Sequence, residues 1–119
     1  MGTVYVVQES PGKNIAGAMG FGTLQVLLSY HEQIAFSSEK AVAELREKLR
    51  GFGNEDYVLP IGDPAAIAIA CMVASEVNKG LVKLLKWDRQ EMKYYPVQID
   101  LHPDLARARK GVACGVPKP

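Results

Sequence analysis

The sequence has few of the residues that build metal centres and disulfide frameworks. Its 119 residues include two cysteines, Cys71 and Cys114, and two histidines, His31 and His102. Two cysteines without framework spacing argue against a small secreted disulfide scaffold, and this set offers no zinc-binding pattern. We therefore expect no metal and no cofactor. Cys71 lies in an apolar segment, so it should be an inert thiol with a raised pKa.

Long apolar runs and a recognisable leader segment are also missing. The longest nearly uncharged run, residues 64–75, is too short to cross a bilayer. The first residues, MGTVYVV, lack a charged region followed by an apolar one, so no signal peptide is expected. These features predict a protein without a membrane partner that works in the cytoplasm, either of its own cell or of the host of a virus.

The whole chain has almost no net charge, but its two parts carry net charges of opposite sign. The formal net charge is +1, which shows no strong preference for polyanions. Residues 102–119 carry about +3 and residues 1–101 about −2. We expect residues 1–101 to form a single α/β domain and residues 102–119 to form a basic tail that is poorly ordered or contains a short helix. Such a tail either contacts nucleic acid or an acidic partner, or is simply solvated.

Alternating and helical patterns of apolar residues are present, and they define the fold. Apolar residues make up 48% of a chain whose length suits one domain. The β-branched and aromatic runs predict strands, and the spacing of apolar residues predicts helices. The expected strands are residues 4–8, 23–29, 33–37, 56–61, 81–87 and 94–101, and the expected helices are residues 38–50 and 64–78.

The order of these elements predicts an α/β protein with a mixed sheet of about five or six strands and two main helices. Residues 57–87 should form one right-handed parallel βαβ crossover, and residues 33–37 should pair antiparallel to the second strand. Pro60 should mark the end of its strand, because proline cannot donate to a ladder. Residues 15–22 contain too many glycines to predict a helix.

The helix expected over residues 64–78 is apolar on nearly all of its faces. A small domain rarely covers such a helix completely, so a homo-oligomer is expected to bury its second face. The aromatic residues around the hairpin turn also suit a protein contact, although they suit an ordinary hairpin equally well. The residues that we expect at an interface are Ile69, Met72, Val73, Trp87 and Tyr94.

Two loops follow strands that are expected to be parallel, and ligands bind beyond the carboxyl ends of such strands. The first loop brings a turn glycine, a cation and an amide, and the second brings a glycine and the free N–H groups of a helix start. The alternative interpretation is structural: Asp63 caps its own helix and the glycines only form turns. The predicted ligand-binding residues are Gly12, Lys13, Asn14, Gly62, Asp63, Ala65 and Ala66.

Catalytic motifs find little support in the sequence. None of the serines lies in a Gly-x-Ser-x-Gly context, and no G-x-G-x-x-G or Walker motif is present. His31 stands beside Glu32 in a turn and His102 precedes Pro103; either could act as a base, but a lone surface histidine usually does not. We therefore predict no catalytic residues.

The run IGDPAAIAIACMVASEVNKGLVKLLKWDRQEMKYYPVQIDL resembles small proteins carried by phages and prophages, and the resemblance extends over residues 4–101. It implies no particular activity. In the order of its elements the chain also resembles viral ring nucleases, which degrade the cyclic oligoadenylate signals of type III CRISPR defence. In that family a strand ends in Ile-Gly-His-Asp, whereas here Asp63 and Pro64 stand at the positions of the histidine and the acid.

Three functions are compatible with these patterns. The first is a viral, non-enzymatic binding protein, for example an antagonist of host defence, that acts through an oligomeric surface or on a host protein. The second is a nucleotide or cyclic-oligonucleotide binder that uses the two loops. The third is a phosphodiesterase similar to the ring nucleases, with Glu9 or Asp63 as its acid or base.

Overall fold

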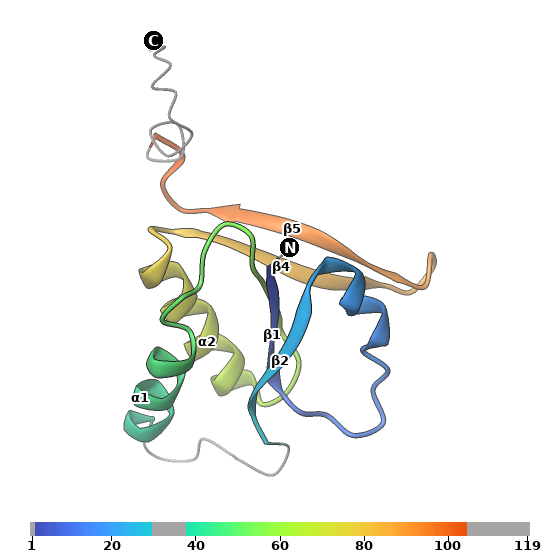
Figure 1. The fold of residues 1–119 in the computed structure, drawn as a ribbon, viewed down its shortest axis with the longest axis horizontal. Helices are drawn as coiled ribbons and strands as arrows, with labels where there is room; N and C mark the ends of the chain where they lie inside the picture. Colours follow the sequence, from blue (N-terminus) through green and yellow to red (C-terminus); the bar gives the residue numbers. More distant parts are fainter. Residues whose placement is uncertain (1, 30–37, 105–119) are drawn as a thin grey trace.

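The computed structural model describes residues 2–29 and 38–104, which build a sheet with helices against both of its faces (Figure 1). The strands are β1 (Thr3–Gln8), β2 (Thr23–Leu28), β3 (Tyr57–Leu59), β4 (Leu81–Asp88) and β5 (Lys93–Asp100). The helices are the 3₁₀ helix η1 (Ala16–Phe21) and the α-helices α1 (Glu39–Lys48) and α2 (Pro64–Val77).

The strand order is β2-β1-β3-β4-β5. The first four strands are parallel, and β5 runs antiparallel to β4 at one edge. The predicted α/β class and mixed sheet are confirmed, and so is the parallel pairing of the two strands that α2 connects. Strand β3 ends directly before Pro60, as predicted from the missing N–H of proline.

The two central strands are buried on both faces because their sequences are continuously apolar. In β1, Tyr5 and Val7 pack against the side of the sheet that α1 and α2 cover. Val4 and Val6 point to the opposite side, where Ala18 of η1 completes a second, smaller core. This alternation follows from the two-residue period of a strand.

Helix α1 lies over the sheet through the apolar stripe that its sequence predicts. Leu45, Leu49 and Phe52 are buried, and Phe52 packs against the ring of Tyr5 at 5.8 Å between ring centroids. Glu44 and Lys48, four residues apart on α1, form an ion pair at 2.8 Å, and the Lys48 ammonium also donates to a carbonyl of β2. Ser38 stands at the N-cap position, where serine is a preferred residue, but its hydroxyl makes no capping hydrogen bond.

Within residues 15–22, Ala16–Phe21 form the short helix η1, which corrects the expectation that so many glycines exclude a helix. A 3₁₀ helix of one or two turns needs little intrinsic helix propensity when tertiary contacts hold it. Here Ile15, Ala18 and Phe21 hold η1 against the sheet. The strand expected at residues 33–37 and most of the short helix expected after Pro103 lie outside the described residues.

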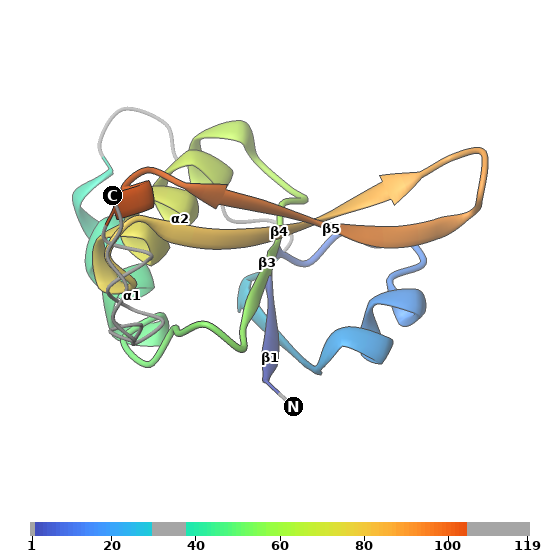
Figure 2. The same cartoon turned by 90° about the horizontal axis from the view of Figure 1, so that it is seen from above.

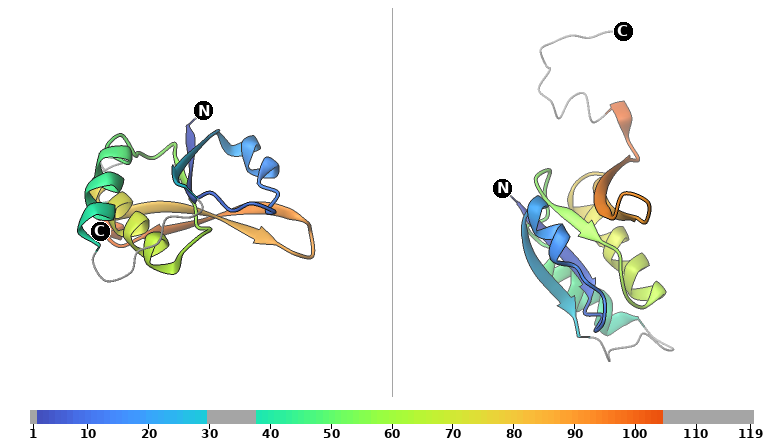
Figure 3. Two further views of the ribbon diagram at one scale, coloured as in Figure 1. Left: turned by 90° about the horizontal axis from the view of Figure 1, so that it is seen from below. Right: turned by 90° about the vertical axis from the view of Figure 1, so that its right-hand side faces the viewer.

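The β4–β5 hairpin extends well beyond β3, the strand that pairs with β4 in the sheet. Its eight residue pairs run from Leu81↔Asp100 to Asp88↔Lys93, while β3 meets β4 only at Val58↔Leu84. The far half of the hairpin therefore extends beyond β3 toward η1, and the near half lies beside α2 (Figure 2). Figure 3 shows the same division from below. Pro96 stands in the middle of β5, opposite Leu85.

Candidate functional site

A buried amide, Gln8, joins three chain segments at the carboxyl end of β1. Its Nε2 donates to the carbonyl oxygen of Ser29 at 2.9 Å, and its Oε1 accepts from the Asp63 N–H at 2.6 Å. Gly62 has a φ of +120°, and a Cβ added there would lie 2.4 Å from the Gln8 Cβ. The loop between β3 and α2 can therefore approach β1 only with a glycine at this position.

The start of α2 is closed by its own side chain. Asp63 is the N-cap, its carboxylate accepts from the Ala66 N–H at 3.0 Å, and its carbonyl accepts from the Ile67 N–H. Ala66 is fully buried. The prediction that the N–H groups at the start of this helix are free is therefore wrong for Ala66 and Ile67, and the structural interpretation of Asp63 as a cap is confirmed.

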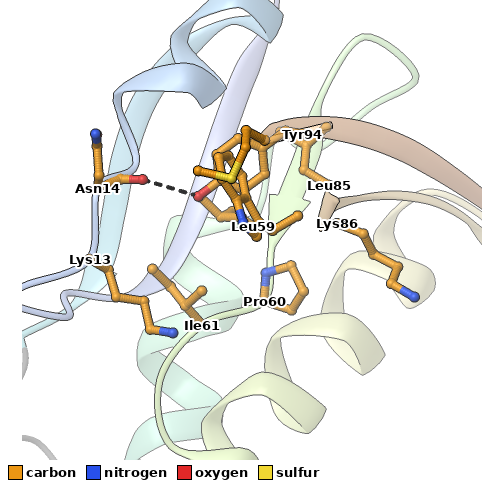
Figure 4. Close-up of a pocket in the computed structure, with 10 residues that line it drawn as sticks. Lys13, Asn14, Leu59, Pro60, Ile61, Leu85, Lys86 and Tyr94 are labelled. Atoms are coloured by element: carbon orange, nitrogen blue, oxygen red, sulfur yellow. Dashed lines mark hydrogen bonds between the residues drawn. The ribbon is translucent and has the colours of Figure 1, made fainter. Parts of the chain in front are cut away.

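The loop after β1 and the loop after β3 meet, but the residues of the second loop that line the pocket come before those predicted. Lys13 and Asn14 lie across the pocket from Pro60 and Ile61, while Gly62 to Ala66 lie outside its lining. We call this space of about 590 Å³ the hairpin pocket. The described residues that line it are Lys13, Asn14, Leu59, Pro60, Ile61, Leu85, Lys86, Trp87, Met92 and Tyr94 (Figure 4). Gly12, with a φ of +89°, shapes the loop without lining the pocket.

The charge in the hairpin pocket is of one sign. Lys13 and Lys86 bring two ammonium groups, and in the view of Figure 4 their side chains lie on opposite sides of Pro60. None of the described residues that line the pocket is acidic. The pocket thus suits an anion better than a cation.

Two aromatic rings line the pocket. The rings of Trp87 and Tyr94 meet edge to face at 4.9 Å between centroids, and Trp87 remains 43% exposed. Burial raises the pKa of the Tyr94 phenol above its ordinary value of 10.0, so the phenol is protonated at neutral pH. Its hydroxyl donates a long 3.5 Å hydrogen bond to the Asn14 carbonyl.

The sequence prediction missed Lys86 and Met92 as pocket residues and treated Trp87 and Tyr94 as a protein contact. Met92 lies in the turn, where it adopts a left-handed φ of +55° and lines the pocket. What the sequence did not show is how far the hairpin extends over the loop after β1, because that depends on the single pairing between β3 and β4.

A second surface lies between α2 and the near half of the hairpin. We call it the α2–β5 groove. Its apolar residues are Cys71, Met72, Val82, Leu84, Ile99 and Leu101, and its polar rim is Ser75, Glu76, Lys79 and His102. Burial raises the pKa of the Cys71 thiol, as the sequence predicted.

Met72 is the most exposed of the large apolar residues of α2, at 68%. It stands between the α2–β5 groove and a hollow of about 490 Å³ between α1 and α2, which Val42 and Ile69 also line. Val73 is only 4% exposed and belongs to the core. The five predicted interface residues therefore form no single surface, because Trp87 and Tyr94 line the other site.

The structure adds two general observations on the described residues. No helix among them combines the length and the apolar character needed to span a bilayer. They also contain no cluster of three or more His, Cys, Asp or Glu side chains that would hold a metal ion.

Comparison with known proteins gives one match. Curated proteins and solved structures yielded no match, and the resemblance to ring nucleases stays a prediction. A family model described as "Phage Pam3 gp32-like protein" matches residues 2–101, which are nearly the whole described chain. The resemblance to small phage proteins seen in the sequence is thereby confirmed, and this chain belongs to the Phage Pam3 gp32-like protein family.

Proposed function

We propose that this phage protein is a non-enzymatic binding protein of the host cytoplasm, and that its working form is a homodimer joined through the α2–β5 groove. The observation that carries the proposal is the position of Met72. Its largely exposed side chain lines two neighbouring apolar hollows.

A projection beside a hollow is the shape that a two-fold interface requires. In an isologous contact the same patch meets itself, so each Met72 inserts into a hollow of the other copy. Ile99 and Leu101 are 40% and 61% exposed and extend the apolar area along β5. A contiguous patch of this kind on a small protein is typical of an association surface.

The charges around the groove also permit self-association. Arg46 and Glu76 form an ion pair at 2.9 Å beside Met72, and Lys79 lies further along the rim. Because both signs are present, the groove is not surrounded by charge of a single sign that would keep two copies apart. A patch with a single sign of charge would favour a partner of opposite charge instead.

The test is the mass of the full-length protein in solution, measured by light scattering and by sedimentation over a range of concentrations. We expect twice the 13.0 kDa of one chain. Met72→Asp should shift the mass to that of a monomer, because it places a charge in the centre of an apolar contact.

Met19→Asp is the matched control, since Met19 is 60% exposed and lies on η1, away from the groove. It should leave the dimer intact. A wild-type protein that is monomeric at all concentrations, or equal effects of the two substitutions, would rule out the groove as a dimer interface. If the full-length protein is a monomer and a chain that ends after Asp104 is a dimer, residues 105–119 are instead the segment that occupies the groove.

A further inference from the structure

The hairpin pocket lies at the point where the sheet reverses its direction of winding. From β1 the chain turns to η1 on one face of the sheet, and from the neighbouring β3 it turns to α2 on the other face. The loops after two such strands diverge and leave a crevice beyond their carboxyl ends, where α/β proteins bind ligands. Residues 13–14 and 59–61 are the two sides of this crevice.

The walls of the pocket divide into two chemical regions. Trp87 and Tyr94 of the hairpin supply ring surfaces, and Leu59 and Leu85 form an apolar floor. Lys13 and Lys86 supply positive charge, and the Asn14 side-chain amide is a further polar group of the same loop. The Asn14 Oδ1 already accepts from the Ala16 N–H at 3.0 Å, so its NH₂ group remains as the donor.

We propose that the hairpin pocket binds a small ligand that carries a planar ring and a phosphate group, the chemical class of the nucleoside phosphates. The ring packs against Trp87 and Tyr94, since aromatic side chains accept a planar ring without regard to its hydrogen-bonding pattern. The phosphate lies between Lys13 and Lys86. A volume of about 590 Å³ falls within the range of small-ligand sites.

This site retains Lys13 and Asn14 from the sequence prediction and replaces the start of α2 by the hairpin. The start of α2 suits a phosphate poorly for two reasons. The Asp63 carboxylate would lie close to the phosphate, and this carboxylate already accepts the hydrogen bond of the Ala66 N–H. The hairpin instead contributes a lysine and two aromatic rings. The proposal does not depend on dimer formation, because the α2–β5 groove shares none of the residues that line the pocket.

The experiment uses the intrinsic fluorescence of Trp87, which is the single tryptophan of the chain. The full-length protein is titrated with AMP, GMP, CMP and UMP, and in parallel with the four corresponding nucleosides. We expect saturable quenching by at least one nucleotide, with an affinity at least ten times that for its nucleoside. Raising the salt concentration should weaken nucleotide binding, because the phosphate contacts are exposed ammonium groups.

Two variants and a matched control assign the binding to the pocket. Lys13→Ala and Lys86→Ala should each weaken the nucleotide at least fivefold and leave the nucleoside unchanged. Lys40→Ala removes the same charge from the exposed side of α1 and should have no effect. The proposal is overturned if no nucleotide gives saturable quenching up to 10 mM (roughly the weak end of specific binding), if nucleoside and nucleotide bind equally, or if all three lysine variants behave alike.

Discussion

The hairpin pocket and the α2–β5 groove share the β4–β5 ribbon but differ in chemistry. The far half of the ribbon gives the pocket a tryptophan, a tyrosine and a lysine, and the facing loop adds a second lysine. The near half gives the groove valine, leucine and isoleucine, and α2 adds methionine and cysteine. We propose from this difference that one hairpin supports two kinds of recognition, with a small phosphate-bearing ligand at one end and an apolar protein surface at the other.

The largest expected effect concerns the close contact between Gly62, in the loop before α2, and Gln8 at the end of β1. Gly62→Ala should lower the free energy of unfolding by about 3 kcal/mol, because the new Cβ meets the Gln8 side chain and the φ of +120° strains any other residue. Urea denaturation measures the change. Gly12→Ala is the control: its φ is +89° but a Cβ there meets open space, so the loss should be about 1 kcal/mol. Equal losses would show that contact with Gln8 contributes nothing.

The next effect separates the two regions. Trp87→Ala should weaken nucleotide binding at least tenfold, measured by calorimetry because the fluorescent reporter is lost, and should leave the mass in solution unchanged. Met72→Asp should do the reverse. This expectation follows from the separate linings of the two sites. If either substitution removes both properties, the pocket and the groove are not independent.

A smaller effect concerns the Cys71 thiol in the groove. Because burial raises its pKa, the folded state holds the thiol proton more tightly than the unfolded state does. The resulting stability is fully present below the ordinary thiol pKa of 9.0 and is lost as the pH rises through the folded-state pKa. Cys71→Ser should therefore flatten the decline in stability above pH 9, measured by thermal unfolding in a Cys114→Ser background. A decline that is the same in both proteins would contradict this assignment.

The smallest effect concerns the hairpin turn. Met92→Gly should change the free energy of unfolding by no more than about 0.5 kcal/mol, because relief of the left-handed φ offsets the greater chain entropy of glycine. The same change removes a side chain from the pocket wall, so nucleotide affinity should fall two- to threefold while the dimer is unaffected. Thermal unfolding and calorimetry give the two readings. A large loss of stability would mean that Met92 supports the hairpin itself.

The periodic elements of the fold were predictable, since β1, β3, α2 and the hairpin each carry a strong local pattern. Helix η1 was not, because its glycine-rich segment is held by contacts with residues far along the chain, among them Leu59 and Leu85. Tertiary contacts overrode a poor local propensity there.

The candidate site was predictable only in part, for a similar reason. Lys13 and Asn14 follow β1, so the rule for parallel strands located them. The partners of these residues come from a hairpin about seventy positions later, and the register that places Trp87 and Tyr94 opposite the loop leaves no local pattern in the sequence. The hydrogen bond from Asp63 to Gln8, which moves the start of α2 out of the pocket, is equally non-local.

Pro96 has a consequence for how far assembly can proceed. Pro96 lies in β5, which is an edge strand of the sheet, and a proline there has no N–H to donate to a strand of another copy. Polymerisation by strand addition is disfavoured along that edge, so if copies meet through α2, as we propose, they should form a closed pair rather than a growing fibre.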